Sequence, residues 1–175
     1  MKEKKVNIYI DMDGVQAVYG FEDSLEDMYQ PGYFRNRPSY ENMIEVIKLL
    51  KEDPRYDVTV LSAVFPDGSN TADKQIWLKE QGLGDVAACF VPYGSVKADY
   101  ADPERVNILI DDFSKNLFEW EDAGKNFYGI KFLNEGNGTN GTWDAAGGFT
   151  VNYRMPKERL HMAITGLADA IGKAA

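Results

Sequence analysis

Cysteine is almost absent from this sequence, which has Cys89 alone among 175 residues. No disulfide can form within the chain, which fits a reducing compartment. Cys89 lies in the apolar run A-A-C-F-V, so we expect a small buried apolar residue there and not a nucleophile. No apolar run is long enough for a signal peptide or a membrane span, so we expect a cytoplasmic protein without a membrane partner.

Basic residues are also in short supply, because 19 Lys and Arg face 28 Asp and Glu and leave a net charge of −9. Nucleic-acid binding normally needs a basic face, so this class of function is disfavoured. A small anionic substrate remains possible, since a local cation can reverse the field inside one pocket. The length and the 13% aromatic content predict one globular domain over residues 1–175, without repeats or linkers.

Short strand-like runs alternate with helical patterns along the chain. This alternation predicts an α/β fold, a Rossmann-like three-layer sandwich with a mainly parallel sheet. Ser39 is the expected N-cap of a helix that ends near Glu52. The expected strands are 6–10, 57–62, 87–91, 106–110 and, as the last one, 128–133. The other main helices are expected from Asn70 or Thr71 to about Gly82, over 113–123 and over 157–171.

The segment between the first two strands is longer than one crossover needs. We therefore expect a small helical cap at about 16–38, inserted after the first strand, with a helix over 22–29. Its aromatic and arginine side chains are expected mainly to pack the cap onto the domain. Tyr19 and Phe21 are the expected exceptions, as possible substrate contacts, because they closely follow the first strand.

Oxygen-bearing side chains end three of the expected strands. Asp11 and Asp13 follow the first strand, Ser62 ends the second, and Asp111 and Asp112 end a later one. Read alone, Asp11 to Gly14 is equally consistent with an Asp-rich turn. The recurrence favours one shared site, since ligands of open parallel sheets bind beyond the carboxyl ends of the strands.

Four carboxylates at one sheet edge need a cation between them, and their hard oxygens suit Mg²⁺. Beside a bound Mg²⁺, Asp11 would act as a nucleophile and form an aspartyl-phosphate. Asp13 would protonate the leaving oxygen and then activate water. Ser62 would hydrogen-bond the phosphate, and a lysine would supply positive charge to the same oxygens.

These motifs resemble the four motifs of the haloacid dehalogenase superfamily: D-M-D-G-V after a strand, a Ser ending the second strand, a downstream Lys, and I-D-D. The resemblance implies that Mg²⁺ is bound by Asp11, the main-chain carbonyl of Asp13 and Asp111, with Asp112 either supporting these ligands or serving as an alternative one. An acid at position 13 favours phosphatases over dehalogenases. The chain is most similar to the 5′(3′)-deoxyribonucleotidase group, which implies a nucleoside monophosphate substrate. Gln16 departs from that group, where an apolar residue is usual.

The phosphate-binding lysine has three candidates. Lys97 precedes the I-D-D strand, where the family's third motif falls, and is the expected one. Lys115 is expected to point to solvent, and Lys74 ranks third. The Asn/Gly-rich segment 134–148 follows the last expected strand, so an approach to the site stays open, but a surface connection is the expected role. His161 is expected to be structural.

Two other functions remain open. One is a phosphatase for another metabolite, such as a sugar phosphate, and the other is a binding protein with this fold and no turnover. The intact carboxylates argue against the second, since the fold does not need a nucleophile or an acid.

Overall fold

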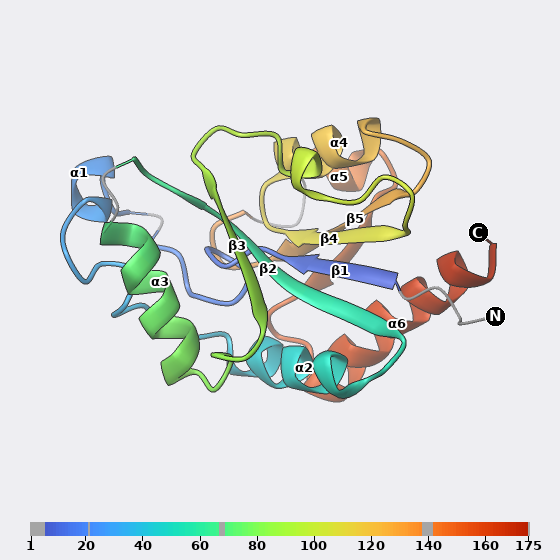
Figure 1. The fold of residues 1–175 in the computed structure, drawn as a ribbon, viewed down its shortest axis with the longest axis horizontal. Coiled ribbons are helices and arrows are strands. Elements are labelled where there is room, and N and C mark those ends of the chain that lie inside the picture. The colour runs from blue at the N-terminus through green and yellow to red at the C-terminus, as the bar shows by residue number, and fades with distance from the viewer. Residues whose placement is uncertain (1–5, 21, 67–68, 138–141, 175) are drawn as a thin grey trace.

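A computed structural model describes residues 6–20, 22–66, 69–137 and 142–174 of the chain. Its described part forms one six-stranded sheet in which every pairing is parallel, with the order β3-β2-β1-β4-β5-β6. The expected α/β class is therefore confirmed, and the sheet is parallel throughout (Figure 1). The strands are β1 (Val6–Ile10), β2 (Tyr56–Val64), β3 (Ala87–Pro92), β4 (Asn107–Asp111), β5 (Phe127–Leu133) and β6 (Phe149–Asn152).

Helices cover both faces of the sheet and complete the three expected layers. One face packs against α2 (Glu41–Glu52), α3 (Ser69–Glu80) and α6 (Lys157–Ala174). The other packs against α4 (Ser114–Asp122), α5 (Thr142–Ala145) and the 3₁₀ helix η1 (Lys97–Tyr100). Figure 1 shows α2 and α6 below the sheet and α4 and α5 above it.

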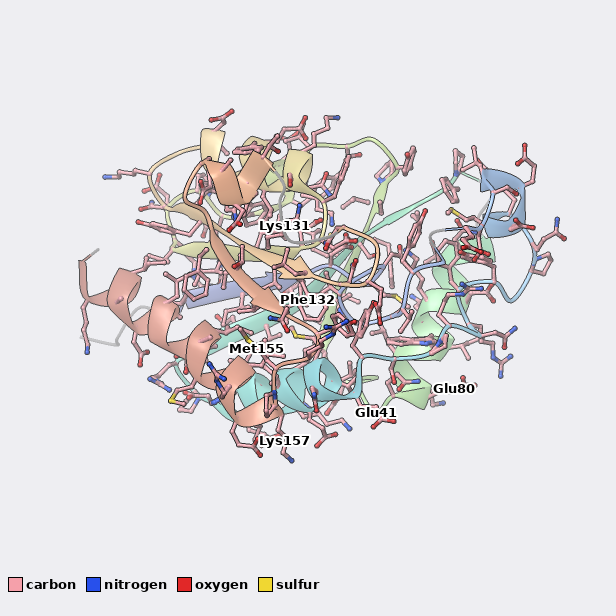
Figure 2. The ribbon with its side chains drawn as sticks, turned by 180° about the vertical axis from the view of Figure 1, so that it is seen from behind. Glu41, Glu80, Lys131, Phe132, Met155 and Lys157 are labelled. Atoms are coloured by element: carbon pink, nitrogen blue, oxygen red, sulfur yellow. The ribbon has the colours of Figure 1, made fainter. Side chains whose placement is uncertain are left out.

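The central strands β1 and β4 are buried along their whole length. A parallel strand covered on both faces has no solvent side, so its sequence is almost continuously apolar. Successive residues still point to opposite faces. On β5, for example, Phe132 packs into the core on the α2 side, whereas Lys131 bonds to Ser114 of α4 (Figure 2).

Several expected boundaries were wrong. Strand β2 continues to Val64, two residues beyond Ser62, and β6 follows the strand that was expected to be the last. Tyr40, not Ser39, is the N-cap of α2, and no side chain caps that helix. Helix α3 already includes Asn70, whose side-chain oxygen accepts a hydrogen bond from the Phe65 N–H. Cys89 is half-buried, not buried.

The two ends of the segment inserted after β1 lie next to each other, because Ala17 and Ser39 form an antiparallel bridge. It is less helical than expected, because its helix α1 spans only Leu25–Met28 and starts with a capping box between Ser24 and Asp27. Figure 1 shows α1 near α3, at the end of the sheet to which the strand arrows point.

Polar contacts fix this segment in place. Asp23 accepts hydrogen bonds from the Tyr33 hydroxyl (2.8 Å) and from Arg37 (2.9 Å), and the Trp77 indole of α3 donates to the Arg37 carbonyl (2.7 Å). The Gly32 N–H also donates to Asp73 of α3 (2.8 Å). Among the described residues, no helix is both long and apolar enough to cross a membrane.

Candidate active site

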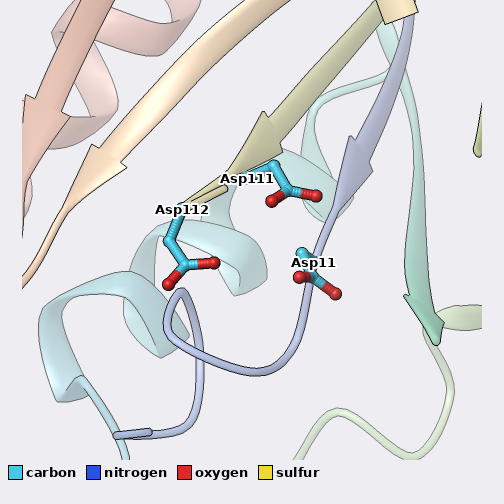
Figure 3. A group of neighbouring side chains, drawn as sticks. All are labelled: Asp11, Asp111 and Asp112. Carbon is cyan, nitrogen blue, oxygen red and sulfur yellow. The ribbon is translucent and has the colours of Figure 1, made fainter. Parts of the chain in front are cut away.

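Asp11 directly follows β1, and Asp111 is the last residue of the neighbouring strand β4. The two side chains therefore lie side by side at the carboxyl edge of the sheet (Figure 3). From β1 the chain crosses to β2 and β3 on one side, whereas β4 leads to β5 and β6 on the other. This reversal opens a crevice at the sheet edge, where doubly wound folds bind their ligands.

The Asp11 carboxylate is held by two donors. Its Oδ1 accepts a hydrogen bond from the Met12 N–H (2.8 Å) and lies 3.0 Å from the ammonium nitrogen of Lys97. Among the described residues, no donor reaches Oδ2. One carboxylate oxygen is thus fixed, and the other is available to a ligand.

Lys97 also bonds to Asp111, with 2.6 Å between Nζ and Oδ2, and both side chains are almost fully buried. Burial alone would lower the pKa of Lys97, but Asp11 and Asp111 outweigh it and raise this pKa above its usual value. Lys97 therefore remains a cation between two carboxylates.

Asp111 is fully buried and held from two further sides. The Phe113 N–H donates to its Oδ1 (2.8 Å), and the Asn116 amide donates to its Oδ2 (3.0 Å). Burial raises the pKa of Asp111, Lys97 lowers it, and Asp11 raises it again, with a net upward shift. Lys97 thus opposes the combined effect of burial and of Asp11 on this pKa but does not cancel it.

Asp112 lies against the loop that follows β1. A Cβ atom on Gly14, whose φ is +75°, would stand 2.1 Å from Asp112 Oδ2, so only glycine fits there. Burial raises the pKa of Asp112 well above its usual value, and the charges of Asp111 and Asp11 add to this shift.

Asp11, Asp111 and Asp112 together could hold a metal ion. Each offers a carboxylate oxygen, and the three oxygens lie within 4.8 Å of one another. Figure 3 shows these side chains gathered at the ends of β1 and β4. The donor set consists of hard oxygens, which suits Mg²⁺. A divalent cation would also relieve the mutual repulsion of these carboxylates, which adds to the effect of burial on the pKa values of Asp111 and Asp112.

Asp13 belongs to a second group of contacts, built around Lys74 of α3. The Lys74 side chain is fully buried, and its Nζ lies 2.5 Å from Asp13 Oδ2 and 2.9 Å from Ser62 Oγ. Nζ also donates to the Ala63 carbonyl (2.8 Å) and lies 4.5 Å from the centre of the Phe34 ring. Lys74 thus joins the loop after β1, the end of β2 and the inserted segment.

Burial also raises the pKa of Asp13; Lys74 opposes this effect, and the charge of Asp11 adds to it. The protonated form of Asp13 is therefore easier to reach than for a solvated carboxyl group, as a general acid requires.

These side chains border a cavity of about 390 Å³. Asp11, Asp13, Asp112 and Lys97 form its polar end, together with Asn116 and Asn137. The rest of the lining is mainly aromatic or apolar: Tyr19, Met28, Phe34, Ala63, Val64, Phe65, Tyr93 and Phe113. Within the described lining, Lys97 is the one basic side chain.

Most of the residues expected from the sequence come together here. Asp11, Asp13, Asp112, Lys97 and Tyr19 line the cavity, and Asp111 adjoins it through Lys97. Ser62 does not line the cavity, and its contact is with Lys74. Phe21 lies outside the described residues. Lys115 is largely exposed and faces Glu119 on the same helix at 3.4 Å.

The expected surface position of segment 134–148 holds for residues 144–147, which are exposed, but not for its start or for Trp143. Asn134 is buried and bonds to Gly14 and Asp112, and Asn137 lines the cavity. Further along, Trp143 is buried against α4 and β5. Asn134 and Asn137 were not among the site residues predicted from the sequence. The composition around them does indicate a tight turn, since Asn and Gly favour such turns.

No protein-family model matches this chain, and no curated protein is significantly similar to it. The function therefore has to be inferred from the geometry of the site.

Proposed function

We propose that this protein is a Mg²⁺-dependent phosphomonoester hydrolase with Asp11 as its nucleophile, similar to phosphatases of the haloacid dehalogenase superfamily. One observation carries the proposal. Carboxylates from two neighbouring strand ends, with a lysine between them, meet at the polar end of a cavity at the sheet's crevice.

Asp11, Asp111 and Asp112 would hold the metal ion, and the close spacing of their oxygens supports this assignment. When bound, Mg²⁺ supplies positive charge that neutralises the phosphate oxygens and makes the phosphorus more electrophilic. Lys97 would add its charge at the same end of the cavity, where its pKa keeps it protonated.

In the first step, one oxygen of the Asp11 carboxylate attacks phosphorus. The new bond forms as the ester P–O bond breaks, and the leaving oxygen takes the proton of Asp13. The two donors on Oδ1 support this assignment because they orient the carboxylate. In the second step, water attacks the aspartyl-phosphate, Asp13 takes a proton from it, and phosphate leaves as Asp11 is regenerated.

Lys74 and Ser62 would support these steps by positioning Asp13, without contacting the reacting atoms. Lys74 holds Asp13 and is itself bonded to Ser62, so the acid stays next to the nucleophile. Ser62, which was expected to contact the phosphate directly, lies next to the cavity-lining Ala63 and would act on the phosphate through Lys74 and Asp13.

The apolar end of the cavity favours a nucleoside monophosphate as the substrate. Aromatic rings bind the faces of a base, whereas a sugar phosphate would need polar partners for each hydroxyl group. Because Lys97 is the one cation in the described lining, the site fits a single phosphoryl group better than a diphosphate.

The test is a panel of ribo- and deoxynucleoside monophosphates and sugar phosphates, assayed for phosphate release with Mg²⁺ and with chelator. We expect chelator-sensitive hydrolysis that is fastest with nucleotides. Replacing exposed lining aromatics, in Tyr93→Ala and Phe113→Ala, should lower kcat/KM for nucleotides about tenfold, from a stacking energy of about 1–3 kcal/mol per base. Tyr100→Ala is the control, since Tyr100 is exposed and lies outside the lining.

Either alternative function would show in the same assay. Faster hydrolysis of sugar phosphates, unaffected by the two aromatic substitutions, would assign the site to another metabolite. Binding of Mg²⁺ and nucleotide without any release of phosphate would indicate a binding protein.

A further inference from the structure

We infer that Asn134 is a positioning residue that aims the carboxylate of Asp112 at the metal ion. The inference rests on the proposed function, because it assigns Asp112 to the metal site. Asn134 directly follows β5, and its side-chain amide donates to Asp112 Oδ2 (3.1 Å). Within the described part of the chain, no other side chain donates to that carboxylate.

The same amide also donates to the main-chain carbonyl of Gly14 (2.8 Å). Asn134 therefore ties Asp112 to the loop that carries Asp11 and Asp13. The contact is close, since Asp112 Oδ2 lies where a Cβ atom of residue 14 would stand.

The hydrogen-bonding capacity of the Asn134 side chain is fully used. Its two amide protons go to Gly14 and Asp112, and its Oδ1 accepts from the N–H groups of Gly136 (3.0 Å) and Asn137 (3.0 Å). An amide offers two donors and two lone pairs, so this is its complete set. Asn134 is also buried, with 4% of its surface exposed. Burial and the four hydrogen bonds together hold the side chain in one orientation.

A second amide supports the same turn, residues 134–137. Asn137 Oδ1 accepts from the Asn134 N–H (2.9 Å), and Asn137 Nδ2 donates to the carbonyls of Asp112 (3.1 Å) and Phe132 (2.8 Å). Main chain and side chain of Asp112 are thus held by two different residues of one turn.

This support matters because the charges around Asp112 work against its position. The carboxylates of Asp111 and Asp11 lie close to that of Asp112 and repel it, whereas the Asn134 amide attracts it. Without that donor, we expect the carboxylate to turn away from the other two metal ligands. Loss of a partner that orients a metal ligand typically weakens metal binding about 10–100-fold.

The experiment measures metal affinity directly in Asn134→Ser. Serine still favours a turn through its hydroxyl but is too short to reach Asp112. The probe is Mn²⁺, which prefers the same oxygen ligands as Mg²⁺ and reports free ion by electron paramagnetic resonance. We expect about 10-fold weaker binding, a matching rise in the Mg²⁺ concentration needed for half-maximal activity, and a kcat at saturating Mg²⁺ within about threefold of wild type.

Glu135→Gln is the matched control for damage to the turn. Glu135 anchors the turn to the start of α2 by accepting a hydrogen bond from the Tyr40 hydroxyl (2.5 Å), and among the described residues no hydrogen bond or ion pair joins it to Asp112. We expect wild-type Mn²⁺ affinity in this variant. Should Asn134→Ser lack a cooperative thermal transition in chelator, Asn134→Thr replaces it with the same expectation.

A double-mutant cycle then tests whether Asn134 acts through Asp112. In an Asp112→Asn background, Asn134→Ser should change Mn²⁺ affinity less than twofold, because the ligand that it orients is gone. The same 10-fold loss in both backgrounds, or wild-type affinity in Asn134→Ser alone, would overturn the inference.

Failure of the proposed function would look different. A wild-type protein that binds Mn²⁺ but hydrolyses no phosphomonoester would refute the activity and leave the positioning role intact. A wild-type protein that binds no divalent ion would overturn both.

Discussion

Replacing Lys74 by methionine should show how strongly one buried ammonium group supports the site. The substitution keeps an unbranched side chain but removes the charge that contacts Asp13, Ser62 and the Ala63 carbonyl. Breaking one partner of a buried ion pair costs about 3–5 kcal/mol, because the other charge is left uncompensated. The Asp13 side chain is 24% exposed, so we expect the lower end of that range, about 3 kcal/mol.

Chemical and thermal unfolding would measure this effect. A loss of about 3 kcal/mol corresponds to a fall in Tm of roughly 6–12 °C for a domain of this size. Lys79→Met is the matched control on the same helix, because Lys79 is exposed, and it should stay within about 0.5 kcal/mol of wild type.

A second substitution tests the electrostatic cause. Adding Asp13→Asn to Lys74→Met removes the uncompensated charge, so the double variant should be about 1–2 kcal/mol more stable than Lys74→Met alone. Wild-type stability in Lys74→Met, or a double variant as unstable as the sum of the single changes, would refute the reasoning. In Lys74→Met kcat should fall because Asp13 is no longer held, and in the double variant it should fall because the acid itself is gone.

Two further predictions concern the metal site. Gly14→Ala should destabilise the protein about 2 kcal/mol more than Gly147→Ala in urea unfolding, because both glycines have a positive φ but only at Gly14 does a Cβ atom meet the Asp112 carboxylate; equal losses would contradict the packing argument. Lys97→Met should lower metal-free stability by about 3 kcal/mol, since Asp11 then faces other carboxylates without a cation. Thermal scans should show a larger stabilisation by excess Mg²⁺ in that variant than in wild type, and equal stabilisation would count against a metal site at these carboxylates.

The central strands could be predicted from the sequence because burial on both faces forces nearly continuous apolar runs, as in β1 and β4. Asp11 and Asp111 could be predicted as neighbours for the same reason, since both end such runs. Strand β6 was missed because it is only four residues long and follows two glycines in a segment rich in turn residues.

The contacts of Lys74 and Asn134 depend on tertiary packing, and the sequence shows them only in part. Lys74 lies three and four residues before the buried Trp77 and Leu78, so it shares their side of α3. That spacing indicates a buried lysine, but its partners depend on how α3 meets the inserted segment. The Asn134 turn has a local signal, whereas its partner Asp112 lies 22 residues away and is brought near only by the pairing of β4 with β5.

The central claim is a covalent phosphoryl-enzyme at Asp11, and acid quenching during turnover followed by mass spectrometry tests it most directly. Wild-type protein quenched during turnover of a nucleoside monophosphate with Mg²⁺ should carry the mass of one phosphoryl group on the peptide that contains Asp11. The adduct should be absent with chelator and in Asp11→Asn. Phosphate release that continues in Asp11→Asn, or an adduct on a different peptide, would contradict the account.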